Sequence, residues 1–350
     1  MRKLDGQFEC HRVESSNDKT AIPLVLLNET FARFEQNCKQ FEFGNADCDF
    51  VLELCGALLF PYEIKEEFAQ KAQDLLEGYL IAGYPEATMW PMVDQGSVSH
   101  GSYRLGETLL LNLSCRLQKG YGGGDPTMEN IAYYIKILPK VIDRQFPCFL
   151  LDICGPLMSV YGIVNTGSSD VICEPLVMSF PLIFFRNNWL MESLVRMCAS
   201  LKAAVKELRD RCFQLDRANE ETVSFQYVEH IHRFVFKAKD HTGKEVIIKF
   251  AHQYGQQVHE LCSNTGFAPV LLFYEILSSG WVFIVPRRRN AVDSTDARAQ
   301  LLKIQSTLAG ASFVREDLRE GNVMWDTSGN RVVVVLIDFD WSVSIGTRHF

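Results

Sequence analysis

An ordered set of polar residues in the last part of the chain has the types and spacing that phosphoryl transfer requires. Asp317 is followed five residues later by Asn322, and the apolar run 332–337 ends in Asp338. In this chemistry one aspartate accepts or orients the proton of the attacking hydroxyl. An asparagine and a second aspartate hold the metal that neutralises the nucleotide phosphates. The pattern predicts Asp317 as catalytic base and Asn322 and Asp338 as ligands of Mg²⁺.

Lys249 extends this set upstream. It ends the apolar stretch Val246–Lys249, which matches a strand that presents a lysine to the α- and β-phosphates of ATP. Glu260, in the helical segment that follows, is a candidate ion-pair partner for Lys249. His259 or another neighbour is the alternative residue to face inward. The predicted cofactors are therefore ATP and Mg²⁺.

Each of these residues also has a simpler interpretation. Asp317 and Asn322 are residue types that favour turns, because their side chains bond to their own backbone. Lys249 can be the solvated end of a strand. Asp338 is harder to explain in this way, because a carboxylate after an unbroken apolar run is costly to bury unless it is paired or binds metal.

The sequence also departs from the protein-kinase pattern at three places. The segment 225–234 contains no glycine, although a Gly-rich phosphate loop is expected there. Arg315 stands two residues before Asp317, where a histidine is usual. Asp340 follows Asp-Phe, where a glycine is usual.

The elements that must position these residues fall into two predicted domains with a connecting segment. Apolar spacing predicts helices in 22–84 and 127–141, a strand at 108–113, and two strands at 148–154 and 157–164 joined by a tight turn. These make a mixed α/β domain at 1–187. Residues 188–221 are predicted as a connecting helix, and 222–350 as a β-rich domain with helical pieces near 258–262 and 293–309.

Composition supports two folded domains. The 350 residues are 47% hydrophobic, enough for a core in each domain, and this argues against a mainly disordered chain. A net charge of −8 disfavours nonspecific nucleic-acid binding through global charge. The 11 cysteines are too sparse, and odd in number, for a disulfide scaffold. Together with the absence of long apolar stretches, this predicts a soluble intracellular protein of the cytoplasm or nucleus with no membrane partner.

Five stretches together resemble the kinase-like domain of fungal and oomycete Crinkler-type proteins. They are Val246–Phe250, Gln253–Cys262, Thr265–Leu271, Gly280–Val285 and Leu336–Ser342. In that group an Asp-Phe-Asp-Trp metal motif is usual, so the resemblance accounts for Asp340 but not for Arg315. It implies a kinase-like phosphotransferase that acts on a protein substrate, and an effector that can reach a host cell by unconventional export.

Such proteins often carry an N-terminal domain similar to PD-(D/E)XK nucleases, in which a strand ending in Glu-x-Lys precedes a Gly-rich segment and a helix. The matching stretches here are Leu109–Arg116, Gly120–Pro126 and Ala132–Tyr134. Ser114 and Arg116 occupy the Glu and Lys positions. A serine brings no charge to a metal, and a guanidinium cannot deprotonate. Nuclease activity is therefore not expected.

Other acids are candidates to replace the missing carboxylate. Asp94 is a possible upstream acid, and Glu107 or Asp125 are possible substitutes. Without a working site, this domain is left with a structural role or with binding of nucleic acid or protein.

The predicted fold is thus a mixed-sheet, restriction-endonuclease-like domain followed by a minimal kinase-like domain with a β-rich N-lobe and a truncated C-lobe. The leading hypothesis is a phosphotransferase that uses Mg·ATP. The alternative is a catalytically inactive pseudokinase and pseudonuclease that acts as a protein- or nucleic-acid-binding module.

Overall fold

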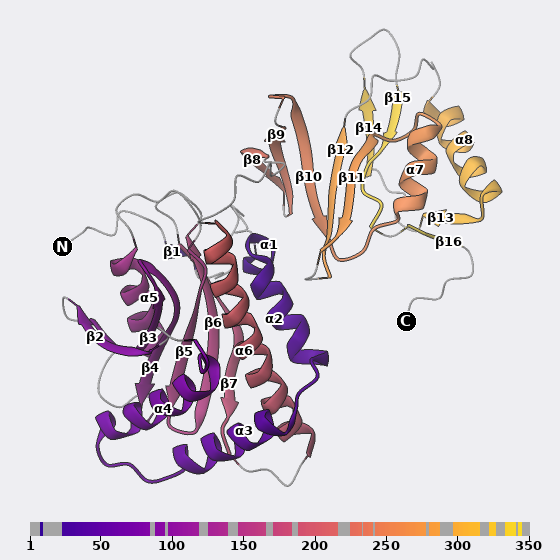
Figure 1. Cartoon of the computed structure of the whole chain (residues 1–350). Coiled ribbons are helices and arrows are strands. Elements are labelled where there is room, and N and C mark those ends of the chain that lie inside the picture. The colour runs from indigo at the N-terminus through magenta and orange to yellow at the C-terminus, as the bar shows by residue number, and fades with distance from the viewer. Residues whose placement is uncertain are drawn as a thin grey trace. The chain divides into compact units, whose positions relative to one another are not determined.

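The chain divides near residue 220 into two compact units, close to the predicted start of the second domain at 222. The structure is a computed structural model, shown in Figure 1. It describes residues 8–9, 23–84, 88–94, 97–118, 125–138, 146–165, 171–183, 188–215, 225–232, 234–240, 242–277, 280–287, 297–315, 322–326, 333–340 and 342–344.

The first unit begins with helices, as the apolar spacing predicts. They are α1 (Leu24–Leu27), α2 (Glu29–Gln40), α3 (Asn45–Leu58) and α4 (Lys65–Leu80). Asn28 caps α2, because its side chain accepts a hydrogen bond from the backbone of Thr30. The apolar faces of these helices are buried in the core of the first unit. Helices α1 and α4 contact strands of the sheet that follows, and α3 packs against α4.

A seven-stranded mixed sheet forms the centre of the first unit, in the order β1-β7-β6-β5-β4-β3-β2. Its strands are β1 (Phe8–Glu9), β2 (Trp90–Asp94), β3 (Ser97–Leu105), β4 (Thr108–Arg116), β5 (Cys148–Cys154), β6 (Leu157–Asn165) and β7 (Val171–Pro181). Strands β4 and β5 are parallel, with helix α5 (Pro126–Ile137) between them in sequence. A parallel pair needs such a crossover. The mixed α/β architecture expected for this part of the chain is therefore present.

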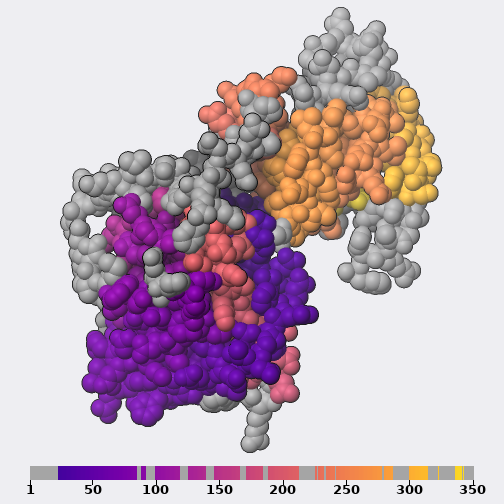
Figure 2. Space-filling view, in the orientation of Figure 1, coloured from indigo at the N-terminus to yellow at the C-terminus, as the bar shows by residue number. Residues whose placement is uncertain are grey.

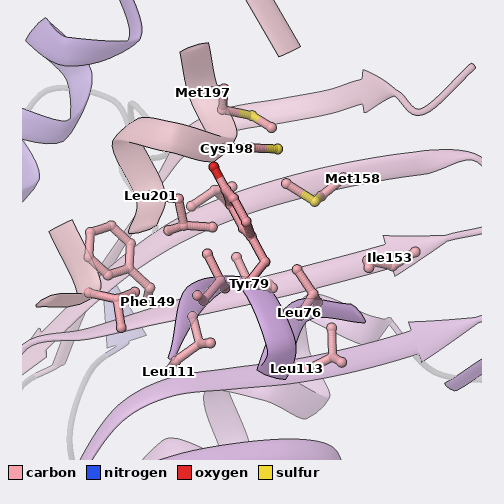
Figure 3. Packing of buried hydrophobic residues seen from close by; sticks show 14 of the residues in the cluster. Leu76, Tyr79, Leu111, Leu113, Phe149, Ile153, Met158, Met197, Cys198 and Leu201 are labelled. Atoms are coloured by element: carbon pink, nitrogen blue, oxygen red, sulfur yellow. The ribbon is translucent and has the colours of Figure 1, made fainter. Parts of the chain in front are cut away.

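The long helix α6 (Asn188–Leu215) belongs to the core of the first unit. Its apolar stripe includes Met197, Cys198 and Leu201, which lie over the sheet together with Tyr79 of α4 (Figure 3). The sequence-based interpretation of 188–221 as a connecting segment is corrected in this respect. An amphipathic stripe of this length requires an apolar partner, and the face of the sheet provides one.

The second unit contains a five-stranded antiparallel sheet in the order β11-β12-β10-β9-β8. Its strands are β8 (Gln226–His232), β9 (Val235–Lys239), β10 (Glu245–Ala251), β11 (Val270–Ile276) and β12 (Val282–Arg287). Helix α7 (Gln256–Asn264) lies between β10 and β11 in sequence, and α8 (Ala297–Gly310) follows β12. Two small antiparallel pairs complete the unit: β13 (Phe313–Arg315) with β16 (Ser342–Ser344), and β14 (Val323–Asp326) with β15 (Val333–Leu336).

In the space-filling view, the described atoms of each unit form a continuous packed body (Figure 2). The ten cysteines in the described ranges are free thiols. None of the helices that the structure describes is long and apolar enough to cross a bilayer.

Candidate functional site

Lys249 and Asp338 meet at the sheet of the second unit, although 89 residues separate them in sequence. Lys249 lies on β10, which is bonded to β9 on one side and to β12 on the other. The Nζ atom of Lys249 lies 2.7 Å from Oδ1 of Asp338 and 2.6 Å from Oδ1 of Asp340. The Lys249 side chain is 15% exposed, so its charge is held largely by these two carboxylates.

The backbone of Asp338 is in the left-handed region, with φ of 66°. This conformation is unfavourable for most residues with a Cβ, and aspartate is one of the few types that tolerates it. Oδ1 of Asp338 also accepts a hydrogen bond of 3.3 Å from the backbone N–H of Asp340. Non-glycine residues held in this way are common where a site needs a fixed side chain.

Two carboxylates share one ammonium group at this site. Burial raises the pKa of Asp340 to about 6, the negative charge of Asp338 adds to this effect, and Lys249 opposes it. Burial alone would also raise the pKa of Asp338, but the hydrogen bond and the charge of Lys249 hold it below its usual value. With both acids ionised, these three groups carry an excess negative charge, which favours the binding of a cation.

Asn322 is brought next to Asp338 by the β14–β15 hairpin. Val323 pairs with Leu336 in this hairpin, and the carbonyl oxygen of Asn322 accepts a 3.0 Å hydrogen bond from the N–H of Ile337. Asn322 is buried, with 6% exposure. The amide oxygen of Asn322 and the two carboxylates are oxygen ligands of the kind that Mg²⁺ prefers. Within the described ranges, no group of three or more His, Cys, Asp or Glu residues is arranged to hold a metal.

Two of the residues that the sequence singles out lie wholly or partly outside the described residues. The predicted base Asp317 lies outside the described residues. The backbone of Arg315 lies in β13 and pairs with Ser342, but its side chain also lies outside the described part.

Glu260 does not serve as the partner of Lys249 in this structure, contrary to one of the two sequence-based interpretations. It is exposed on α7 and accepts a 2.8 Å hydrogen bond from Nε2 of Gln256. The residue that faces inward is His259, the alternative, which is only 1% exposed. Neighbouring positions on a helix point about 100° apart, so only one of the two residues can face the sheet.

His259 connects α7 to the segment that carries the two carboxylates. Its ring stacks on Phe339, with centroids 4.6 Å apart and planes 4° from parallel. Its Nε2 donates to the carbonyl oxygen of Pro269 at 2.8 Å, and the hydroxyl of Tyr254 is hydrogen-bonded to Nδ1 at 2.6 Å. The N–H of Gly255 also donates to the carbonyl oxygen of Phe339 at 2.9 Å. The helix and the 338–340 segment are therefore joined by both side-chain and backbone contacts.

A second polar group lies in the first unit, around the Ser-x-Arg end of β4. Ser114 is directly opposite Asp152 of the parallel strand β5, so the two side chains share one face of the sheet. Asp152 is 5% exposed and accepts hydrogen bonds from Oγ1 of Thr127 at 2.5 Å and Nδ2 of Asn130 at 2.6 Å. The guanidinium of Arg116 forms an ion pair on this side of the sheet.

The acids around this group are already engaged within the protein. Glu129 pairs with Arg116, and Asp125 caps α5 by accepting a 2.8 Å hydrogen bond from the N–H of Thr127. Glu107 is exposed in the turn at the opposite end of β4. The side chain of Asp94 lies outside the described part. The described residues therefore do not present the clustered, free carboxylates that a metal-dependent nuclease needs.

Comparison with known proteins gives limited similarity. No protein-family model and no curated protein matches the sequence. Part of the chain is similar to the structure of the Cydia pomonella granulovirus kinase PK-1, with 15% identity, coverage of 41% of this chain and 59% of that chain, and a TM-score of 0.29. Part is also similar to the yeast RNA Pol II CTD kinase CTDK-1 complex, with 15% identity, coverage of 37% and 50%, and a TM-score of 0.26.

The chain therefore spans between half and three fifths of the length of these two chains. Since both TM-scores lie below 0.5, the function of this protein has to be argued from its own strand order and side chains.

Proposed function

We propose that the second unit is a kinase-like domain that transfers phosphate from Mg·ATP to a hydroxyl group, with a protein as the expected acceptor. The single observation that carries this proposal is the 2.7 Å contact between Lys249 of β10 and Asp338, which comes after β15. In protein kinases the phosphate-binding lysine stands on the third strand of the N-terminal lobe and the metal-binding aspartate on a later segment.

The order of elements supports the same assignment. Lys249 lies on the third strand of an antiparallel sheet, and a helix follows between this strand and the next. The kinase pattern has a helix at this place as well. The match therefore extends from the residue types to the elements that position them.

Each residue has a defined role in this proposal. The ammonium of Lys249 would bind phosphate oxygens of the nucleotide. Asp338 and Asn322 would hold Mg²⁺, which neutralises charge on the phosphates when it is bound. Asp317 keeps its predicted role as the group that receives or orients the proton of the acceptor hydroxyl.

Nucleotide binding and phosphate transfer test the proposal together. We expect Mg·ATP to raise the melting temperature of the wild type, because a ligand that binds only the folded state stabilises it. Asp338→Ala should abolish this shift and any transfer of labelled phosphate from ATP, and Lys249→Met should reduce both. Lys237→Met is a matched control, since Lys237 lies on the same sheet but pairs with Glu245. Equal transfer by the wild type and Asp338→Ala would exclude the proposed chemistry.

A second candidate function is nucleotide binding without transfer. The β8–β9 hairpin takes the place of the Gly-rich loop, yet it contains no glycine and exposes the apolar side chains of Val228 and Ile231. Backbone N–H groups of a Gly-rich loop normally cover the phosphates. A thermal shift with Mg·ATP, together with no transfer to any protein or peptide acceptor, would favour this function.

For the first unit we propose a nuclease-like fold that has lost its catalytic site and retains a binding role. The proposal is supported by the order β4, α5, β5, in which Ser114 and Arg116, the positions that the resemblance assigns to Glu and Lys, end the strand before the helix. Incubation of the protein with plasmid DNA and Mg²⁺ or Mn²⁺ should give no cleavage. Cleavage that Asp152→Asn or Asp125→Asn abolishes would contradict this proposal.

A further inference from the structure

We propose that Asp340 is the residue that positions Lys249, in place of the helix glutamate of the kinase pattern. This inference deepens the proposed phosphotransferase and depends on it for its functional consequence. It concerns a position where the pattern has a glycine, which has no side chain to hold a lysine. In this chain the same position carries a carboxylate that reaches the ammonium group.

The contact between Asp340 and Lys249 is short and partly shielded from water. Oδ1 of Asp340 lies 2.6 Å from Nζ of Lys249, and the two side chains are 27% and 15% exposed. The Tyr254 ring lies with its centroid 5.6 Å from the same Nζ atom. A charge-assisted hydrogen bond in such surroundings fixes a flexible lysine more firmly than a fully solvated pair does.

Helix α7 provides no carboxylate for this purpose in the structure. Its inward residue is His259, and Glu260 is exposed with Gln256 as its partner. The helix instead holds Phe339, through the His259 ring and the N–H of Gly255. Because Phe339 stands directly before Asp340, these contacts join the helix to the segment whose acids hold Lys249.

In this arrangement the two acids of the 338–340 segment have different roles: one binds the metal and the other positions the lysine. Asp338, whose backbone is left-handed and whose Oδ1 also contacts Nζ of Lys249, is assigned to the metal together with Asn322. Asp340 then keeps Lys249 in place at the sheet, so that the ammonium is directed toward a bound phosphate. The competing interpretation is that Asp340 is a further metal ligand, and the experiment below distinguishes the two.

The first measurement needs no nucleotide. The rate at which an amine-reactive acylating reagent modifies Lys249 is followed by peptide mass spectrometry in the full chain. Asp340→Asn should raise this rate about tenfold, which is the factor expected for the loss of one hydrogen bond between charged groups. Asp340→Gly, which restores the glycine of the pattern, should have the same effect and guards against a folding defect specific to asparagine.

Two matched variants accompany this measurement. Glu260→Gln tests the helix-borne partner and should leave the rate at Lys249 unchanged. Glu245→Gln removes the partner of Lys237 on the neighbouring strand and should change labelling at Lys237 only. An increase at Lys249 in Glu260→Gln, or no change at Lys249 in either Asp340 variant, would overturn the proposal.

The second measurement is the affinity for Mg·ATP in a double-mutant cycle at saturating Mg²⁺. If Asp340 acts through Lys249, Lys249→Met and the double variant with Asp340→Asn should have the same affinity, because the lysine to be positioned is absent. Additive losses, with a higher Mg²⁺ requirement in Asp340→Asn, would show a metal ligand and overturn the proposal. If the wild type binds no Mg·ATP, the phosphotransferase proposal fails alone, and the labelling experiment still decides the role of Asp340.

Discussion

Asp152 in the first unit allows a quantitative prediction about pH and stability. Burial raises the pKa of this carboxyl from 3.8 to about 6, hydrogen bonds from Thr127 and Asn130 reduce the rise, and the charges of Asp125 and Glu129 add to it. The folded protein therefore holds the proton more tightly than the unfolded chain. The stabilisation is complete below the unfolded pKa and is lost as the pH rises through the folded pKa. A shift of this size corresponds to about 3 kcal/mol.

Asp152→Asn removes the ionisation and can keep both hydrogen-bond partners. The amide oxygen can accept from Asn130, and the amide N–H can donate to Oγ1 of Thr127, whose proton can then be donated to the hydroxyl of Tyr161 at 3.3 Å. Relative to this variant, the wild type should lose ~2–3 kcal/mol of unfolding free energy between about pH 4 and about pH 7.

The assay compares the two proteins at each pH, so that all other titrating groups cancel. Urea unfolding gives the free energies, and hydrogen exchange of the β4 and β5 amides shows that the change is in the first unit. Asp74→Asn, at an exposed carboxylate on α4, serves as the control and should show no such trend. A difference between wild type and Asp152→Asn that does not vary with pH would refute the reasoning.

Three further predictions concern the elements that carry the sites. Leu201→Ala should lower the unfolding free energy by ~2–5 kcal/mol, because Leu201 of α6 is 1% exposed within the first core. The same change in a solvated connecting helix would lower it far less, and urea unfolding measures the difference. Gly255→Ala should weaken Mg·ATP binding and lower the melting temperature, because its Cβ would lie 2.5 Å from the Cβ of Ser342 and 2.6 Å from the carbonyl oxygen of Ser342. Gly310→Ala, in open space at the end of α8, is the control. His259→Ala should destabilise the second unit by ~2–4 kcal/mol and weaken Mg·ATP binding, because the His259 ring stacks on Phe339. Urea unfolding and calorimetry measure the two effects, and unchanged values would contradict the link through Phe339.

The elements that sequence analysis predicted well are those with strong local signals. The strands at 148–154 and 157–164 are confirmed as β5 and β6, and Gly155 in the turn between them has a φ of 55°, which glycine adopts at low cost. The packing of α6 into the first core was not predicted. The apolar stripe of a helix is visible in sequence, but the face that covers it depends on contacts distant along the chain.

Within the site, the residues that could be predicted are those that their own element identifies. Lys249 ends a β-type stretch, and Asp338 follows an apolar run that makes its carboxylate conspicuous. Asp340 was recognised as a departure from the kinase pattern for which the resemblance accounts, but its contact was not predicted, because nothing local shows that its side chain returns to a lysine 91 residues earlier. The signal that could have identified it was the exchange of a glycine for an acid beside the aspartate predicted to bind metal.

The outward position of Glu260 follows from the same electrostatics that place Asp340. Lys249 already balances two carboxylates, and burial, with the negative charge of Asp338, raises the pKa of Asp340 although Lys249 opposes the rise. A third carboxylate turned inward from α7 would lose its hydration and meet a site that is already negative. His259 can be buried there because the carbonyl oxygen of Pro269 and the hydroxyl of Tyr254 satisfy its ring nitrogens. Once an acid replaces the glycine after Asp-Phe, the helix no longer needs a glutamate at this lysine, and electrostatic repulsion favours a residue without negative charge.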